Sequence, residues 1–513
     1  MPLFDHPLEE PTQTGRTFDP CILVIFGATG DLTAKKLLPA LYNLKREELL
    51  PTNFACVGFA RRFKTDALFR SEMKEAVGKH SRILPVEESV WQVFAHHLFY
   101  HRSEFTDDAG YISLLGYLRR LDNRYGTKGN RIFYLSTQPS YFTDIVERLR
   151  RNGLLEEDRT RWCRIIIEKP FGRDYASALA LQKTLTCHIP ESRLYRIDHY
   201  LGKETVQNLL VFRFANAIFE NLWNHKYIDH VQFTVAEDIG IGSRGNFYEE
   251  QGFVRDVMQN HMMQLLSLIA MEPPGNLSAS AIHDEKVKVL EVIRPLKGEE
   301  LARSAVRGQY ERGWVGGENV PGYREEQNVA EDSDVETYAA IKLHIDNRRW
   351  DGVPFYLRGG KRLPKRGTKI IVVFKPVPPT LFHGHAPSNH APDANVLAIR
   401  IQPNEGISLK LNCKVPGSDN LLQPVNMDFK YGSFFGTSPP EAYERLICDC
   451  IAGDGTLFAR QDELFSSWRF FTPLLEYWAD KRASPVCGYP AGSRGPEEAD
   501  RMMRESGRVW RLI

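Results

Sequence analysis

The 513-residue chain has no excess of charge of either sign, because 66 basic residues are balanced by 65 acidic ones. Proteins that bind nucleic acid or a membrane surface usually carry a basic excess, so this balance argues against both kinds of partner. Long apolar runs are also missing, and no stretch approaches the length of a membrane span. Any cationic chemistry is therefore expected to be local, inside a pocket.

The chain is also poor in cysteine, with eight residues scattered along it and no metal-ligand spacing among them. Residues 1–20 are acidic and proline-rich, lack the apolar segment of a signal peptide and are expected to form a flexible arm. In a chain of this size, these features predict reduced thiols and a cytoplasmic location.

A metal site is not expected. His383, His385 and His390 cluster in a proline-rich loop, but no carboxylate or thiol stands there at ligand spacing. Histidines in such a loop are usually solvated.

Alternating strands and helices are predicted for residues 21–175. An apolar run at 21–26 predicts a buried strand, and leucines at helical spacing predict a helix within 32–50. Further strands are expected at 55–59, 131–136 and 164–168. This alternation predicts a Rossmann-like domain with a parallel sheet and crossover helices.

Residues 176–513 show a different pattern, in which strand-like runs dominate after about residue 270. Such runs occupy 230–238, 337–346, 369–375, 396–404, 407–413 and 425–432. Several alternate apolar and polar residues, which predicts an α+β domain with a large, mainly antiparallel sheet. Helices at 440–450 and 462–479 are expected to pack on that sheet.

A glycine-containing turn follows the first strand directly and consists of Gly27, Ala28, Thr29, Gly30, Asp31 and Leu32. Glycines allow the backbone to approach a pyrophosphate, and the next helix directs free N–H groups at it. An ordinary strand-to-helix turn could look the same, but the order strand, glycines, helix favours a dinucleotide site. Thr33 stands where Gly or Ala is usual.

The end of the second strand indicates which dinucleotide binds. An NAD site would place an acidic residue there, whereas this chain has Arg61 and Arg62. Arginine suits a ribose 2′-phosphate, which favours NADP, although two surface arginines would look alike.

The densest polar run is RIDHYLGKE, residues 196–204. This run predicts the end of a strand, followed by a loop at a pocket. If Asp198 and His199 are still extended, their side chains point to opposite sides. His199, Tyr200 and Lys203 could bind a phosphate, and the alternative is a solvated turn.

His261 shares a helical face with Val257, Met258 and Leu265. By spacing alone it is a buried core histidine rather than a catalytic one.

Seven motifs together resemble the glucose-6-phosphate dehydrogenase family, over about residues 21–496. They are GATGDL, GFARR, IEKPFG, RIDHYLGKE, RDVMQNH, RWDGVPFYLRGGK and AYERL. RIDHYLGKE is specific to that family, whereas related sugar oxidoreductases also carry a Glu-Lys-Pro like that of IEKPFG. The resemblance implies NADP-dependent oxidation of glucose 6-phosphate to 6-phospho-glucono-1,5-lactone, the first step of the oxidative pentose phosphate pathway. It also implies a homodimer or homotetramer formed through the large sheet.

The resemblance implies a role for each matching residue. His261 corresponds to the general base, Asp198 to its partner, Lys169 to a residue between sugar and nicotinamide, and Pro170 to a hinge. The implied substrate contacts are His199, Tyr200, Lys203, Glu237, Asp256, Lys361, Arg366 and Gln402. The implied cofactor contacts are residues 27–32, Arg61, Lys169 and Pro170.

Some family members bind a second, structural NADP. Parts of that pattern match Arg400, Lys410, Asp428, Arg494 and Trp510. Gly367 departs from it, standing where a basic residue is expected, and the tail lacks the pattern's tyrosine.

Two other functions remain to be distinguished. One is an oxidoreductase for an unphosphorylated hexose, against which the cationic Lys203 and the neighbouring His199 argue. The other is an inactive NADPH-sensing protein, against which the intact Asp198, His261, Lys169 and Lys203 argue.

Overall fold

The computed structural model describes residues 18–378, 380, 392–418, 421–435, 440–480 and 484–512. The described chain divides into two compact units. The first comprises residues 18–169, Thr184–Ile197 and Tyr443–Leu457, and the second comprises Pro170–Lys183, Asp198–Ala442 and residues from Phe458 onward. The boundary proposed at residue 175 stays a prediction. His383, His385 and His390 of the expected histidine loop, and residues 1–17 of the expected arm, lie outside the described residues.

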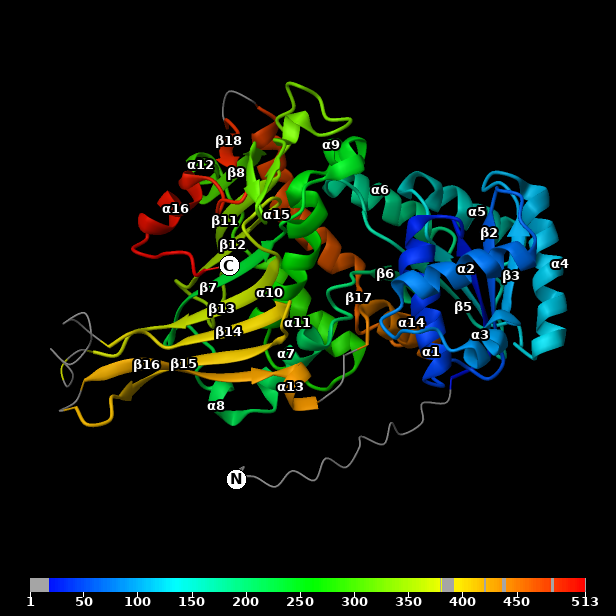
Figure 1. The fold of residues 1–513 in the computed structure, drawn as a ribbon, viewed down its shortest axis with the longest axis horizontal. Coiled ribbons are helices and arrows are strands. Elements are labelled where there is room, and N and C mark those ends of the chain that lie inside the picture. Colours follow the sequence, from blue (N-terminus) through cyan, green and yellow to red (C-terminus); the bar gives the residue numbers. More distant parts are fainter. Residues whose placement is uncertain are drawn as a thin grey trace. The chain divides into compact units, whose positions relative to one another are not determined.

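The first unit is built on parallel strands in the order β6-β5-β4-β1-β2-β3 (Figure 1, blue and cyan). Their bounds are β1 (Cys21–Phe26), β2 (Phe54–Ala60), β3 (Leu98–Arg102), β4 (Arg131–Leu135), β5 (Cys163–Ile167) and β6 (Leu194–Ile197). Every adjacent pair runs parallel, and β1 is buried along its whole length. The predicted Rossmann-like parallel sheet is therefore confirmed.

The helices between these strands are explained by the spacing of their apolar residues and by the residues at their ends. They are α1 (Leu38–Arg46), α2 (Asp66–His80), α3 (Glu88–Ala95), α4 (Asp108–Tyr125) and α5 (Phe142–Arg151), with a π-helical turn, η1 (Thr33–Leu37), before α1. In α5, Phe142, Ile145, Val146 and Leu149 are buried at helical spacing. Helix α4 ends at Gly126, whose φ of 65° suits glycine.

Helix α14 (Ala442–Ala452) packs in the first unit, although the sequence pattern placed it on the second sheet. Its buried Glu444 accepts hydrogen bonds from Asn43 Nδ2 and Arg82 Nε, each at 2.8 Å. Arg164 Nη1 donates to the carbonyl of Cys450 at 2.7 Å. That prediction was wrong because an apolar helix face shows what is buried, not which sheet buries it.

The second unit contains a nine-stranded sheet in the order β16-β15-β14-β13-β7-β12-β11-β8-β18. Its strands are β7 (Ile228–Ala236), β8 (Ala305–Glu311), β11 (Tyr338–His344), β12 (Pro354–Gly360), β13 (Gly367–Phe374), β14 (Val396–Gln402), β15 (Gly406–Lys414), β16 (Leu422–Lys430) and β18 (Cys487–Pro490). Only β7–β12 and β8–β18 are parallel among these described strands, so the prediction of a mainly antiparallel sheet is confirmed.

Most helices of this unit lie in the sequence between strands of the sheet. They are α6 (Tyr175–Thr186, which ends in the first unit), α7 (Glu204–Phe214), α8 (Ala217–Glu220), α9 (Gly245–Phe253), the π-helix η5 (Val254–Met262), α10 (Met263–Ala270), α11 (Ala279–Glu291), α12 (Glu299–Ser304), α13 (Tyr431–Phe435), α15 (Gln461–Ala479) and α16 (Glu497–Arg504). A small hairpin, β9 (Gly313–Val315) and β10 (Glu318–Val320), and the short β17 (Phe458–Ala459) complete the strands of the described chain.

One edge of the nine-stranded sheet gathers the ends of four adjacent strands. Strands β7 and β12 are parallel and end together, with Ala236 opposite Gly360. Antiparallel β13 begins at this edge, with Gly367 opposite Ala236, and β14 ends there, with Gln402 opposite Thr368. Side chains at the end of β14, at the start of β13 and just after β7 and β12 are thus close together although distant in sequence.

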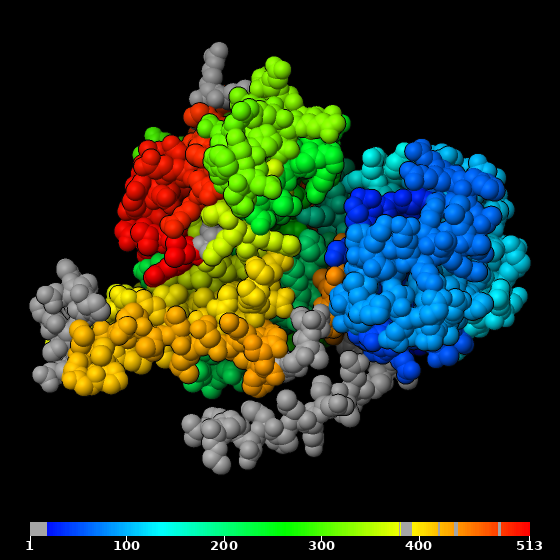
Figure 2. Space-filling view, viewed as in Figure 1, coloured from blue at the N-terminus to red at the C-terminus, as the bar shows by residue number. Residues whose placement is uncertain are grey.

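The outer strands β15 and β16 lie at the surface of the second unit (Figure 2, yellow and orange). Val425 and Met427 on β16 are 41% and 62% exposed. Among the described helices, none is long and apolar enough to cross a membrane.

Candidate active site

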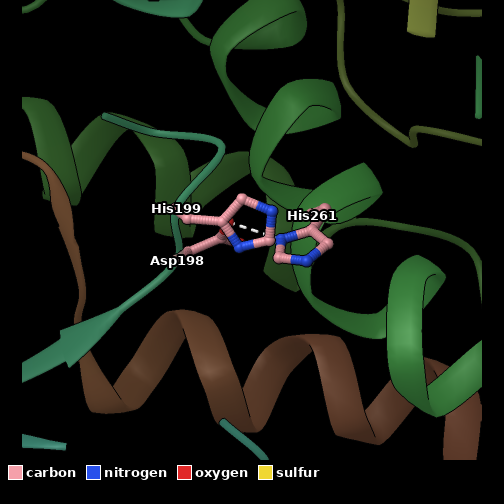
Figure 3. A group of neighbouring side chains, drawn as sticks. All are labelled: Asp198, His199 and His261. Carbon is pink, nitrogen blue, oxygen red and sulfur yellow. Dashed lines mark hydrogen bonds and ion pairs between the residues drawn. The ribbon is translucent and has the colours of Figure 1, made fainter. Parts of the chain in front are cut away.

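The site begins in the turn that follows β6. Asp198, His199 and Tyr200 lie in this turn, and Lys203 caps the start of α7. The backbone N–H of Leu201 donates to the carbonyl of Asp198 at 3.0 Å, closing the turn. The predicted strand end opening into a loop is confirmed. The chain turns here instead of staying extended, so the side chains of Asp198 and His199 need not point to opposite sides. Both lie beside His261 (Figure 3).

His261 and Asp198 form a buried hydrogen-bonded pair. Both residues are 2% exposed, and His261 Nδ1 lies 2.5 Å from Asp198 Oδ1. Burial alone would raise the pKa of the Asp198 carboxyl, but the charge of His261 and its hydrogen bond outweigh burial and hold this pKa well below its usual range. Asp198 therefore stays ionised, which keeps the proton on Nδ1 and makes Nε2 the nitrogen that can accept one.

The π-helix η5 that carries His261 is fixed at both ends. At its start, Gly252 bends the chain with φ 62°, and Glu336 Oε1 accepts a hydrogen bond from the N–H of Val254 at 3.1 Å. Near its end, Ser467 Oγ donates to the carbonyl of Gln259 at 2.5 Å. π-Helical turns are rare and occur often at functional sites, where they redirect a side chain.

Tyr200 joins His261 to Lys203. Its ring stacks on that of His261, with centroids 4.4 Å apart, and its hydroxyl lies 3.2 Å from Thr368 Oγ1. Lys203 Nζ lies 3.9 Å from the Tyr200 ring centroid and donates a hydrogen bond to the side-chain oxygen of Gln402.

Lys203 and Arg366 form a cationic part of the site. Burial, together with the positive charge of Arg366, lowers the pKa of Lys203 to about 8. Arg366 itself is exposed. Two cations near each other attract an anion such as a phosphate, which would relieve their repulsion.

A second polar group lies just beyond the ends of β7 and β12. Lys361, 4% exposed, forms an ion pair with Glu237. The N–H of Glu237 donates to the carbonyl of Gly360 at 2.9 Å, which fixes the two residues side by side. Asp256 lies in the first turn of η5. Ionised carboxylates only accept hydrogen bonds, which suits the hydroxyls of a sugar.

Within the described residues, Asp198, His199 and His261 also offer one ligand atom each within 4.8 Å of one another. Two nitrogen or oxygen ligands of one tetrahedral zinc ion lie about 3.3 Å apart. The 2.5 Å distance between His261 Nδ1 and Asp198 Oδ1 is that of a short hydrogen bond instead. These two atoms are therefore hydrogen-bonded to each other.

The glycine turn after β1 includes a position that only glycine can occupy. Gly27 has φ 82°, and a Cβ there would lie 2.2 Å from the carbonyl oxygen of Ser136, so only glycine fits. The N–H of Gly27 donates to the carbonyl of Phe59 on β2 at 2.9 Å. Arg61 follows β2 directly and is exposed at the same edge of the sheet. These residues fit a pyrophosphate and a 2′-phosphate.

Other predicted residues are placed as follows. Lys169 and Pro170 follow β5, and their roles stay predictions. Of the residues matched to a structural NADP, Arg400 lies 3.4 Å from Asp428 and Lys410 lies 2.5 Å from Asp393.

Arg494 is exposed, and Trp510 packs under Arg358 with its ring centroid 4.5 Å from the guanidinium carbon. These contacts do not test whether a second NADP binds, so that site stays a prediction.

Two residues of this region were missed from the sequence: Thr368, which contacts the hydroxyl of Tyr200, and Tyr248, which lies beside Lys361. Neither belongs to a motif, and only strand register and tertiary packing bring them to the site. The alternation of β13 predicts which side Thr368 faces, but not that Tyr200 lies there.

A parallel nucleotide-binding sheet, combined with a second unit that carries a buried His–Asp pair, defines the class of this protein as a two-domain dinucleotide-dependent dehydrogenase. Two family models match the chain: the NAD binding domain of glucose-6-phosphate dehydrogenase over residues 24–208, and its C-terminal domain over residues 210–511.

Individual proteins agree with this match. A glucose-6-phosphate 1-dehydrogenase from Chlamydia pneumoniae is 55% identical over 501 residues, covering 97% of each chain. A solved glucose-6-phosphate dehydrogenase in complex with its substrate glucose-6-phosphate is 36% identical, with a TM-score of 0.88 over 97% of this chain and 100% of that one.

The enzyme from Mycobacterium avium has a TM-score of 0.82 at 35% identity, over 97% of this chain and 99% of its own. The chain belongs to the glucose-6-phosphate dehydrogenase family, which confirms the resemblance seen in its motifs.

Proposed function

We propose that this protein oxidises glucose 6-phosphate at C1, giving 6-phospho-glucono-1,5-lactone and NADPH, as the first step of the oxidative pentose phosphate pathway. The observation that carries the proposal is the buried His261–Asp198 pair, joined through Tyr200 to the cationic Lys203. An unphosphorylated hexose would give no reason to hold Lys203 near Arg366.

NADP, when bound, supplies the acceptor for the hydride that leaves C1. The residues that would hold it are Gly27, Ala28, Thr29, Gly30, Asp31, Leu32, Arg61, Lys169 and Pro170.

His261 acts as the general base. Its Nδ1–H donates to Asp198, so Nε2 takes the proton of the anomeric hydroxyl. The ionised Asp198 then stabilises the imidazolium that forms, because the two opposite charges share a buried, water-poor site. A positioned base of this kind accelerates proton transfer by about 10²- to 10⁴-fold.

Lys203, His199, Tyr200 and Arg366 bind the phosphate of the substrate, and Gln402 orients the ammonium of Lys203. Glu237 and Asp256 accept hydrogen bonds from the sugar hydroxyls, with Lys361 holding Glu237 in place. The sugar is thus fixed at both ends, which aligns C1 with His261.

We infer that the protein forms a homodimer or homotetramer through the outer strands of its large sheet. The exposed Val425 and Met427 on β16 support this inference, because an apolar sheet edge at the surface favours association. We also infer a cytoplasmic location, in keeping with eight cysteines that are all free thiols.

The general-base role is tested by His261→Asn. Turnover is expected to fall about 10²- to 10⁴-fold while glucose 6-phosphate still binds, because asparagine cannot take the proton but leaves the phosphate contacts intact. The measurements are steady-state kinetics and titration calorimetry with glucose 6-phosphate.

A matched control is His283→Asn, which removes another buried histidine paired with a carboxylate, 2.5 Å from Glu463 Oε1. This variant is expected to lose stability and to keep its turnover per folded molecule. Normal turnover in His261→Asn would show that another group is the base.

A further inference from the structure

Tyr248 on α9 has a buried hydroxyl that the fold does not use. The residue is 1% exposed, and its hydroxyl oxygen has no hydrogen-bond partner among the described residues. Buried polar side chains are almost always hydrogen-bonded, because an unpaired one loses its water and gains nothing in return. An unpaired phenol therefore points to a partner that arrives with a ligand.

The position of the ring shows where that ligand would be. Tyr248 belongs to a buried cluster that also contains Ala236 and Leu363. Ala236 directly precedes Glu237, and the N–H of Leu363 donates to the carbonyl of Glu237 at 2.9 Å. Lys361 Nζ, which pairs with Glu237, lies 5.2 Å from the Tyr248 ring centroid. The phenol is therefore next to the group assigned above to the sugar hydroxyls.

Charge decides which hydrogen-bonding role the phenol can take. Burial first, and then the negative charges of Asp256, Glu336 and Glu237, raise the pKa of Tyr248 well above its usual value. Tyr248 therefore remains a donor throughout the working pH range, whereas the carboxylates around it only accept. A sugar hydroxyl can donate to a carboxylate and accept from a phenol at the same time, so it complements both.

We propose that the Tyr248 hydroxyl binds the substrate, donating a hydrogen bond to the sugar hydroxyl whose own proton is accepted by Glu237 or Asp256. Tyr248 then distinguishes aldose phosphates that carry this hydroxyl from those that lack it. The proposal rests on the proposed function, because it takes the sugar to lie beside Glu237.

The test is Tyr248→Phe, with Tyr323→Phe as the matched control. Tyr323 lies in the same cluster, with its ring centroid 6.0 Å from that of Tyr248, but its hydroxyl already donates to Glu249 Oε1 at 2.5 Å. Calorimetry with glucose 6-phosphate is expected to show about tenfold weaker binding for Tyr248→Phe, which corresponds to the loss of one hydrogen bond. The control is expected to bind glucose 6-phosphate like the wild type but to melt at a lower temperature. Without substrate, Tyr248→Phe is expected to melt at the same temperature as the wild type.

Deoxy analogues of glucose 6-phosphate, each lacking one ring hydroxyl, identify the contact. For one of them, the wild type and Tyr248→Phe should bind equally, because that analogue has already lost the hydroxyl that Tyr248 contacts. Unchanged binding of glucose 6-phosphate by Tyr248→Phe would overturn the proposal. Equal weakening for every analogue would overturn it too, since that indicates altered packing. Failure of the proposed function would appear separately, as a wild-type protein that does not bind glucose 6-phosphate.

Discussion

Tyr200 contacts both the residue proposed to take the proton, His261, and the residue proposed to bind the phosphate, Lys203. Its ring stacks on the proposed base His261, and Lys203 lies 3.9 Å from the same ring. Because the hydroxyl of Tyr200 lies against Thr368, the ring has little freedom to rotate away from either neighbour. This packed side chain therefore helps to fix the spacing between the proposed base and the proposed phosphate site, which would favour a substrate of fixed length.

The lowered pKa of Lys203 leads to a prediction about pH. Its pKa in the folded protein is about 8, below the usual 10.5, so the ammonium is charged below about pH 8 and neutral above it. The value of kcat/KM for glucose 6-phosphate is expected to fall as the pH rises through 8, because the phosphate loses a cationic partner. A pH profile of the wild type and of Lys203→Arg measures this effect.

Lys203→Arg is expected to keep its kcat/KM up to pH 9, since a guanidinium stays charged there. The same alkaline fall in both proteins would mean that a different group titrates.

For individual residues, the sequence identified the polar run itself but not the distant residues that its side chains contact. RIDHYLGKE is dense enough in polar groups to mark a pocket, whereas His261 by spacing alone resembles a core residue. It is in fact buried, and its contacts with Asp198, 63 residues earlier, and with Tyr200 place it beside the polar run. Because no local sequence pattern reveals that contact, the pairing of His261 with Asp198 was predicted only from the resemblance to a family.

Strands that consist of one apolar run were predicted closely. Strands β1, β4 and β5 are buried apolar runs, and their observed ends lie within one residue of the prediction. Strands β3, β12 and β18 were missed because they are short or contain proline, glycine or histidine. The site lies where β12 ends, so its assembly could not be worked out from the predicted strands alone.

A buried ionic group joins helices α10, α11 and α15. Glu463 on α15 is fully buried and accepts hydrogen bonds from Lys286 at 2.9 Å, His283 at 2.5 Å and Gln264 at 3.0 Å. Burial would raise its pKa, but the charges of Lys286 and His283 outweigh burial and lower it to about 2.

Glu463→Gln is expected to destabilise the protein by about 3 kcal/mol at pH 7, because it leaves Lys286 buried without its counter-charge. Since the pKa of Glu463 is lowered from 4.5 to about 2, the stability it contributes is present above pH 4.5 and is lost as the pH falls toward 2. Urea unfolding at pH 7 and pH 3 measures this difference between wild type and variant. A difference that does not narrow at pH 3 would contradict the assignment.

For the whole molecule, we propose that one chain carries both a working nucleotide turn and a working sugar-phosphate site. The two family models cover residues 24–208 and 210–511, so both units belong to the same family. A protein that only senses NADPH would need the turn at Gly27 but would have no use for a buried His261–Asp198 pair. The pair therefore favours an enzyme.

The most direct test is the absorbance at about 340 nm after the purified protein is mixed with NADP and glucose 6-phosphate, with free glucose as the control. We expect a steady rise with the phosphate ester and none with glucose, because the cationic Lys203 and Arg366 attract the phosphate. No rise with any sugar phosphate, with either NADP or NAD, would contradict it and would favour a nucleotide sensor that has kept the fold of its family.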